Sequence, residues 1–154
     1  DVDYELYAEG EALLGWLNAT VELKSSTAFN GNEWIKNIAL KLQQQLKSNS
    51  AEVAHLKMTL SPDKGLGDIA VINLVRNDFI PELSQELPED ITEGQVIINL
   101  RAEANPSLLK QAVIEAVQQI ETDHPRVKGT LDHVEHFRPG KPEPTYRLTE
   151  AVDS

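Results

Sequence analysis

The chain has 154 residues, with 14 Lys or Arg against 25 Asp or Glu, which gives a formal net charge of −11, and it contains no cysteine. This acidic balance argues against a general nucleic-acid binder and against a protein that lies on anionic lipid, because both partners require a basic surface. The lack of cysteine excludes disulfides, thiolate nucleophiles and cysteine-ligated metal centres from this chain.

The sequence also carries features that bear on its location. It has no uncharged apolar run long enough to span a membrane. Five of the first eleven residues are acidic, whereas a signal peptide begins with basic residues followed by an apolar stretch. We therefore expect a cytoplasmic protein. The chain begins with Asp1 rather than Met, as expected for a processed chain or for a domain taken from a larger protein.

The first part of the chain predicts a strand followed by a helix. Residues 1–14 form an N-terminal segment that we expect to be helical or irregular. Residues 15–24 alternate between apolar and polar side chains, which is typical of a half-buried strand. The apolar residues of 33–48 recur with the 3.6-residue period of a helix, and Asn30 or Asn32 can cap its N-terminus.

The middle of the chain predicts two strands joined by a turn. Residues 52–60 alternate, and their predicted buried face consists of Ala54, Leu56, Met58 and Leu60. A turn rich in Pro and Gly leads to an apolar strand at 68–76. A long polar connection then runs to about residue 93.

The last part of the chain repeats the strand–helix–strand order. An alternating strand is predicted at 95–103 and a helix at 107–122, with Pro106 at the first helical position. A final strand follows at 127–138. The tail, 139–154, is rich in Pro and is expected to be extended.

The two copies of this order, residues 15–60 and 95–138, indicate the fold class. Together they predict one α+β domain over residues 15–138, a ferredoxin-like split βαβ sandwich. Such a fold is an antiparallel sheet with two helices on one face. The strand at 68–76 is predicted to be an extra strand that forms a hairpin with 52–60. The alternative is two packed βαβ halves bridged by the extra strand.

The sheet face without helices is the predicted place for ligand binding. Cations are few in this chain, yet several lie on or beside strands, where Arg and Lys can converge on a carboxylate or phosphate. Three Asn residues also interrupt apolar strands, in which Asn is depleted. The ligand-binding candidates are Asn18, His55, Lys57, Asn73, Arg76, Asn99, Arg101, His136 and Arg138. The alternative interpretation is a solvated face with cross-strand ion pairs.

Metal and catalytic motifs give little signal. In the segment DHVEHF, strand alternation places His133 with Glu135, or Asp132 with His136, on one face. A closed zinc site needs about four ligands, so we expect no metal site in this chain. GxSxG, HExxH and P-loop motifs are absent from the sequence, so we expect no catalytic residue and no cofactor here. An enzyme that uses His55 or His136 as a general base is a further hypothesis.

Four segments carry a resemblance to a known family. They are YAEGEALLGWLNATVEL (7–23), HLKMTL (55–60), INLVRND (72–78) and EHFRPGKPEPTYRL (135–148). They resemble the C-terminal, non-GTPase domain of CobW-like GTP-binding proteins, a family of metallochaperones and of accessory proteins for cobalamin and metal enzymes. The family's phosphate-binding loop, magnesium aspartate and CxCC-type metal motif belong to its GTPase domain, and this sequence contains none of them.

The resemblance implies a non-catalytic accessory or interaction domain of a CobW-like GTPase that takes part in delivering a metal or a cobalamin-related cofactor. The implied partner is the GTPase domain of the same protein or a client protein, and a homo-oligomer is left open. GTP, Mg²⁺ and a divalent metal would belong to the full-length protein. The residues themselves leave open a second function, a small-anion-binding domain that uses Lys57, Arg101, Asn99 and His55.

Overall fold

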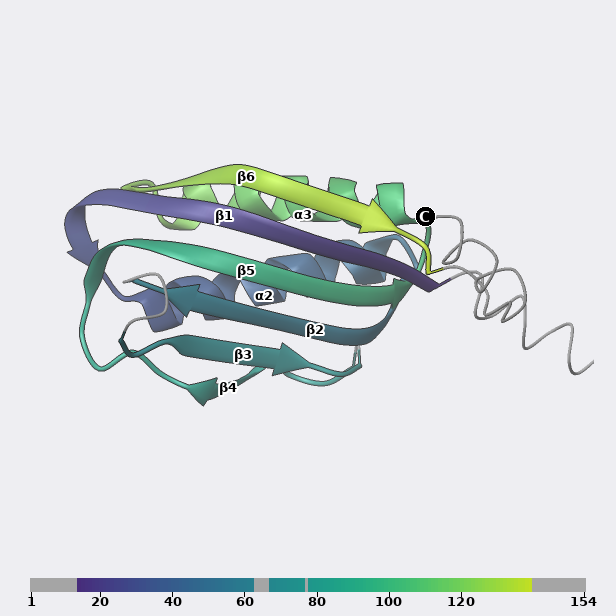
Figure 1. Cartoon of the computed structure of the whole chain (residues 1–154), viewed down its shortest axis with the longest axis horizontal. Coiled ribbons are helices and arrows are strands. Elements are labelled where there is room, and N and C mark those ends of the chain that lie inside the picture. The colour runs from purple at the N-terminus through teal and green to yellow at the C-terminus, as the bar shows by residue number, and fades with distance from the viewer. Residues whose placement is uncertain (1–13, 63–66, 77, 140–154) are drawn as a thin grey trace, which may run out of the picture.

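A computed structural model describes residues 14–62, 67–76 and 78–139, which form six strands and two helices (Figure 1). In chain order the elements are β1 (Leu14–Phe29), α2 (Gly31–Ser48), β2 (Glu52–Ser61), β3 (Ala70–Leu74), β4 (Glu82–Gln85), β5 (Ile91–Glu103), α3 (Pro106–Asp123) and β6 (Val127–Phe137). The N-terminal segment and most of the Pro-rich tail lie outside the described residues.

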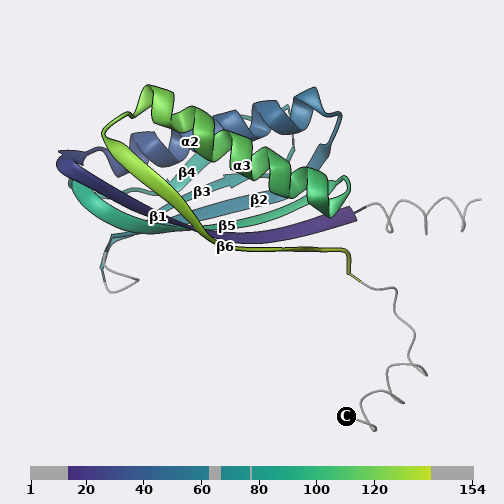
Figure 2. The ribbon, with the colours of Figure 1, turned by 90° about the horizontal axis from the view of Figure 1, so that it is seen from above.

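The six strands form one sheet in the order β4-β3-β2-β5-β1-β6, and every neighbouring pair is antiparallel. Both helices lie on the same face of this sheet (Figure 2). The α+β class with two helices on one face of an antiparallel sheet is therefore confirmed. Neither α2 nor α3, the helices of the described chain, is long and apolar enough to cross a membrane.

The extra strand lies where the hairpin prediction places it. β3 pairs with β2 on the side away from β5, so it widens the sheet and does not bridge the two strand–helix–strand halves. The halves interleave, because β5 of the second half lies between β1 and β2 of the first. The long strands thus share one continuous pair of faces, one beneath the helices and one without them.

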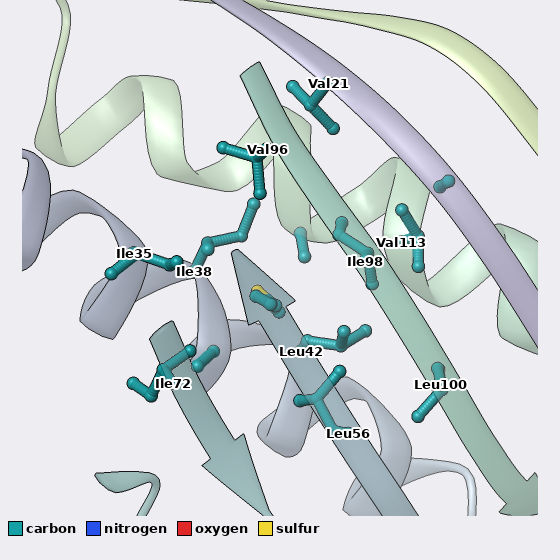
Figure 3. Close-up of a cluster of buried hydrophobic side chains, with 14 of the residues drawn as sticks. Val21, Ile35, Ile38, Leu42, Leu56, Ile72, Val96, Ile98, Leu100 and Val113 are labelled. Atoms are coloured by element: carbon teal, nitrogen blue, oxygen red, sulfur yellow. The ribbon is translucent and has the colours of Figure 1, made fainter. Parts of the chain in front are cut away.

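The core lies between the helices and the sheet, and its side chains are mostly aliphatic (Figure 3). The odd-numbered residues Leu17, Ala19, Val21 and Leu23 of β1 are buried, as the alternation predicts. The even-numbered residues of β5 from Val96 onward are buried in the same way, and side chains of α2 and α3 pack onto both rows. The opposite parity of both strands therefore faces away from the helices.

The helix starts follow the predicted capping residues. The side chain of Asn30 accepts a hydrogen bond from the backbone N–H of Glu33 at 3.1 Å, and Asn105 accepts one from Ser107 at 3.0 Å. Pro106 occupies the first turn of α3, where its missing N–H costs no helical hydrogen bond. Of the two candidate caps for α2, Asn30 is the residue used.

The predicted buried face of β2 is wrong at its first residue. Val53 is buried and Ala54 is exposed, the reverse of the prediction. The pairing of β2 with β5 shifts between Val53 and His55, so Ala54 is an extra residue in a β-bulge. A bulge reverses the alternation on one side of it, and from His55 onward the predicted faces hold.

The predicted polar connection up to residue 93 is also wrong. It contains β4, a strand of four residues that pairs with β3, and β5 begins at Ile91. The pattern misses β4 because three of its four residues are polar and it lies at a sheet edge, where only one side of the strand is paired. The apolar strand predicted at 68–76 is shorter in the structure, Ala70–Leu74.

Candidate functional site

The sheet face that carries no helix, the open face, brings residues from four strands into two neighbouring rows. In the first row His55, Arg101, Trp16 and Phe137 lie directly opposite one another across β2, β5, β1 and β6. In the second row Lys57, Asn99, Asn18 and Glu135 do the same. The rows are two residues apart along each strand, so their side chains share one face.

The first row contains a stack of three side chains. The guanidinium carbon of Arg101 lies 4.1 Å from the ring centroid of Trp16. The Trp16 ring lies 5.7 Å from that of Phe137, centroid to centroid, at an interplanar angle of 49°. A guanidinium held over an indole face keeps its charge and its in-plane N–H donors while its position becomes more restricted. This stack therefore presents a positioned cation beside two aromatic rings.

A depression of about 340 Å³ lies between the two rows. Its lining is Trp16, Asn18, His55, Lys57, Asn99, Leu100, Arg101 and Phe137. Within the described part of the chain, this lining contains two cations, a histidine and two amides, and no carboxylate. In a chain of net charge −11, this is a locally cationic surface.

The polar groups of this depression have unused hydrogen-bonding capacity. Asn18, His55, Lys57 and Asn99 make no side-chain hydrogen bond or ion pair with another described residue. The indole N–H of Trp16 is buried and has no acceptor within the described part of the chain. Buried donors are nearly always satisfied, so an unpaired one beside a depression is unusual. Among the described residues, the depression is thus rich in hydrogen-bond donors and contains no negatively charged acceptor.

The structure brings five of the nine predicted site residues together and separates the rest. Asn18, His55, Lys57, Asn99 and Arg101 line the depression. The other four, Asn73, Arg76, His136 and Arg138, do not line it.

Asn73 lies opposite Lys57 on β3 but donates to the hydroxyl of Ser84 at 3.5 Å. Arg76 follows β3, where it pairs with Asp78 at 3.2 Å and stacks over Phe79 at 5.2 Å. These contacts give both side chains local roles beside the β3–β4 hairpin.

His136, another of the candidates, does not line the depression. His136 lies opposite Leu17, a buried core residue of β1, so it belongs to the helix side of the sheet. The cause is the register of β6: Phe137, one residue further on, is opposite Trp16 and occupies the open face. Arg138 is exposed just beyond the end of β6.

Sequence reasoning did not select Trp16 and Phe137 as site residues. The signal for Trp16 was present, because its even number places it on the same face of β1 as Asn18. Phe137 had no comparable signal. β6 contains a register shift between the positions opposite Thr20 and Val21, which leaves Asp132 as an extra residue and resets the alternation after it.

The histidines do not build a metal site among the residues 14–62, 67–76 and 78–139. No group of three or more His, Asp or Glu there is arranged to hold a metal ion. His133 and Glu135 share the open face of β6, as the alternation predicts, and they form an exposed pair at 3.2 Å. His55 has no carboxylate within ion-pair distance in the described chain, so the geometry gives it no partner for general-base chemistry.

A second depression, of about 370 Å³, has the opposite charge. Its acidic lining residues are Asp68, Glu89, Asp90 and Glu93, and the described residues that line it include no cation. It lies at the start of β5, whereas the cationic depression lies near the end of the same strand. Opposite charges are therefore separated along the length of the sheet.

Comparisons with known proteins add no further constraint. No family model matches the chain, and no curated protein and no solved structure matches it either. The chain is thus defined by its own geometry: an α+β domain that carries a cationic, aromatic-lined depression on the helix-free face of a six-stranded antiparallel sheet.

Proposed function

We propose that this chain is a non-catalytic interaction domain that binds a protein partner through the open face of its sheet. The observation that carries the proposal is the Arg101–Trp16–Phe137 stack beside Lys57 on the face that the helices leave uncovered. Tryptophan and arginine dominate the binding energy of protein interfaces, and Phe is enriched there as well. A stacked arginine has already lost part of its side-chain freedom, which lowers the cost of binding.

The neighbouring surface supports a protein partner over a buried small molecule. Two large apolar side chains on the same face, Ile97 and Phe137, are 41% and 40% exposed, so the apolar surface extends beyond the depression itself. Small-molecule sites enclose most of their ligand, whereas protein interfaces combine a few aromatic anchors with a broad polar rim. The net charge of −11 favours a partner whose contacting surface is basic overall.

The strand order supports the finer fold assignment. The strands β2-β5-β1-β6 are neighbours in that order, and a helix follows β1 and another follows β5. This is the order expected of a ferredoxin-like split βαβ sandwich, with the β3–β4 hairpin added next to β2. We infer that fold for the domain.

The resemblance to CobW-like proteins supports a particular partner. We propose that the chain acts as their C-terminal domain does, in the cytoplasm, in delivering a metal or cobalamin-related cofactor. Its partner on the open face is the GTPase domain, which would also hold GTP, Mg²⁺ and the delivered divalent metal. Hydrogen–deuterium exchange distinguishes this partner from a client protein that binds the same face.

Hydrogen–deuterium exchange of this chain, alone and mixed with a purified CobW-like GTPase domain, tests the proposal. We expect slower exchange in β1, β2 and β5 around the depression and unchanged exchange in α2 and α3. Protection confined to the helices would refute the use of the open face. Unchanged exchange throughout would refute the GTPase domain as partner, and the same measurement with a metal-enzyme client would then decide whether the client binds there.

The second candidate function is a domain that binds a small free anion. The observation that favours it is that Lys57, Arg101, Asn99 and His55 all line the same depression. A thermal-shift screen with inorganic phosphate, citrate, GTP and divalent metals tests it, because a ligand that binds only the folded state raises the melting temperature. A saturable rise with phosphate or citrate alone would favour this function over the interaction domain.

A further inference from the structure

We infer that the cationic depression recognises one carboxylate side chain of the partner, flanked on the partner by basic residues. The inference rests on the proposed function, since it names what a protein partner places in the depression. It follows from the donors that line the depression and from the carboxylates that surround it.

The donors converge on a single anionic group. Arg101 lies directly opposite His55, and Lys57 lies directly opposite Asn99, so the two cations are diagonal neighbours across β2 and β5. Diagonal side chains of this kind are about 7–8 Å apart at their bases, which long side chains span easily. A carboxylate between them accepts hydrogen bonds from the planar guanidinium on one side and from the ammonium on the other.

The amides extend this donor set toward β1. Asn18 and Asn99 lie opposite each other in the row next to Arg101, and neither side chain has a partner among the described residues. Each offers an N–H₂ group that can donate to the same oxyanion. The planar, singly charged carboxylate fits a site whose one guanidinium is stacked on the Trp16 ring.

The rim of the depression carries the opposite charge. Glu52 and Glu103 lie directly opposite each other, one row beyond Arg101. Neither forms an ion pair within the described part of the chain. Like charges directly opposite one another destabilise a sheet, so this pair gains from a cation that a partner supplies.

Glu135 gives the rim a further carboxylate on the β6 side, opposite Asn18. The surface is therefore positive at its centre and negative around it. A partner segment with a central Asp or Glu flanked by Lys or Arg matches both regions. A phosphate dianion would match the centre but would be repelled by Glu52, Glu103 and Glu135, and this favours the carboxylate.

The intrinsic fluorescence of Trp16 gives a direct test in the unlabelled protein. The chain has two tryptophans, and the other, Trp34, is only 1% exposed in the core. A collisional quencher such as acrylamide therefore reports mainly on Trp16. The probes are the peptide amide acetyl-Lys-Glu-Lys, its control acetyl-Lys-Gln-Lys, and inorganic phosphate.

We expect the Glu peptide to protect Trp16 from quenching in a saturable way and the Gln peptide to bind roughly tenfold or more weakly. The comparison is stringent, because the Gln peptide carries more positive charge and would bind better to an acidic protein by charge alone. Arg101→Gln should abolish the preference for the Glu peptide. Lys128→Gln should leave this preference unchanged. Lys128 is exposed and lies opposite Lys24 in the strand register, toward the end of β1 that is far from the depression.

Equal binding of the two peptides would overturn the inference, and so would tighter binding of phosphate than of the Glu peptide. The exchange experiment with the GTPase domain separates this failure from failure of the proposed function. Protection of the open face by that domain, together with equal peptide binding, would refute carboxylate recognition alone. Selective peptide binding without any protein partner on the face would refute the interaction domain and leave the carboxylate site standing.

Discussion

Asn30 and Asn32 are equivalent helix caps by sequence, but the structure predicts different costs for their removal. Asn30 is exposed and accepts one hydrogen bond, from the N–H of Glu33. Asn32 is half-buried, and its side chain makes two hydrogen bonds to Leu87: its amide donates to the carbonyl at 2.9 Å, and its oxygen accepts from the N–H at 2.8 Å. Asn32 therefore fastens the segment before β5 to the start of α2.

The magnitudes follow from the number of groups left unpaired. Asn32→Ala removes both partners of the Leu87 backbone, and at about 1 kcal/mol for each hydrogen bond we expect a loss of about 2 kcal/mol. Asn30→Ala removes one helix cap and should cost about 1 kcal/mol. Asn32→Asp keeps the acceptor for the Leu87 N–H but places a carboxylate oxygen against the Leu87 carbonyl, so it should cost at least as much as Asn32→Ala.

Urea unfolding measures these differences. With an unfolding slope of about 2 kcal/mol per molar urea, Asn32→Ala should lower the midpoint by about 1 M and Asn30→Ala by about 0.5 M, with the slope unchanged. A larger loss for Asn30→Ala than for Asn32→Ala would refute the role of Asn32 as the clamp on Leu87. An Asp variant as stable as the unchanged protein would contradict the hydrogen bond from the Asn32 amide to the Leu87 carbonyl.

Two further predictions concern close packing and pH. A Cβ at Gly15 would collide with the backbone carbonyl of Ala104, so Gly15→Ala should lower the free energy of unfolding by about 1–3 kcal/mol in the same urea assay. The control is Gly129→Ala, whose Cβ would make only ordinary contacts near 3.5 Å and should be tolerated. The hydrogen bond and charge of Lys41 hold the pKa of the Asp123 carboxyl below its ordinary value of 3.8. This pair therefore contributes stability above pH 3.8 that is lost as the pH falls through the lowered pKa, and Asp123→Asn should remove that part of the pH dependence; an unchanged pH profile would contradict it.

The periodicity of the sequence predicts most of the fold because most of its elements bury one face. β1, α2, β5 and α3 each have a long apolar stripe of the correct period, and the structure contains all four. The exceptions share a cause. Ala54 lies in a bulge, and β4 is short and at the edge, so neither is fixed by a repeating pattern of burial.

The candidate site was predictable in part for a related reason. Alternation within one strand shows that Asn18 lies on the open face of β1, and that Lys57 lies on the open face of β2. It does not show which strand lies beside which. The contact between Arg101 and Trp16 depends on β5 lying next to β1, and that order is set by long-range pairing.

The separation of charge along the sheet has a consequence for how a partner approaches. The acidic depression at the start of β5 and the cationic one near its end present opposite charges at different points along the same strand. A partner with complementary charges is attracted in one orientation more than in others, before any contact forms, and this raises the fraction of productive collisions. The rate of association should then fall steeply with added salt, while the rate of dissociation, governed by the Arg101–Trp16 stack, should change little.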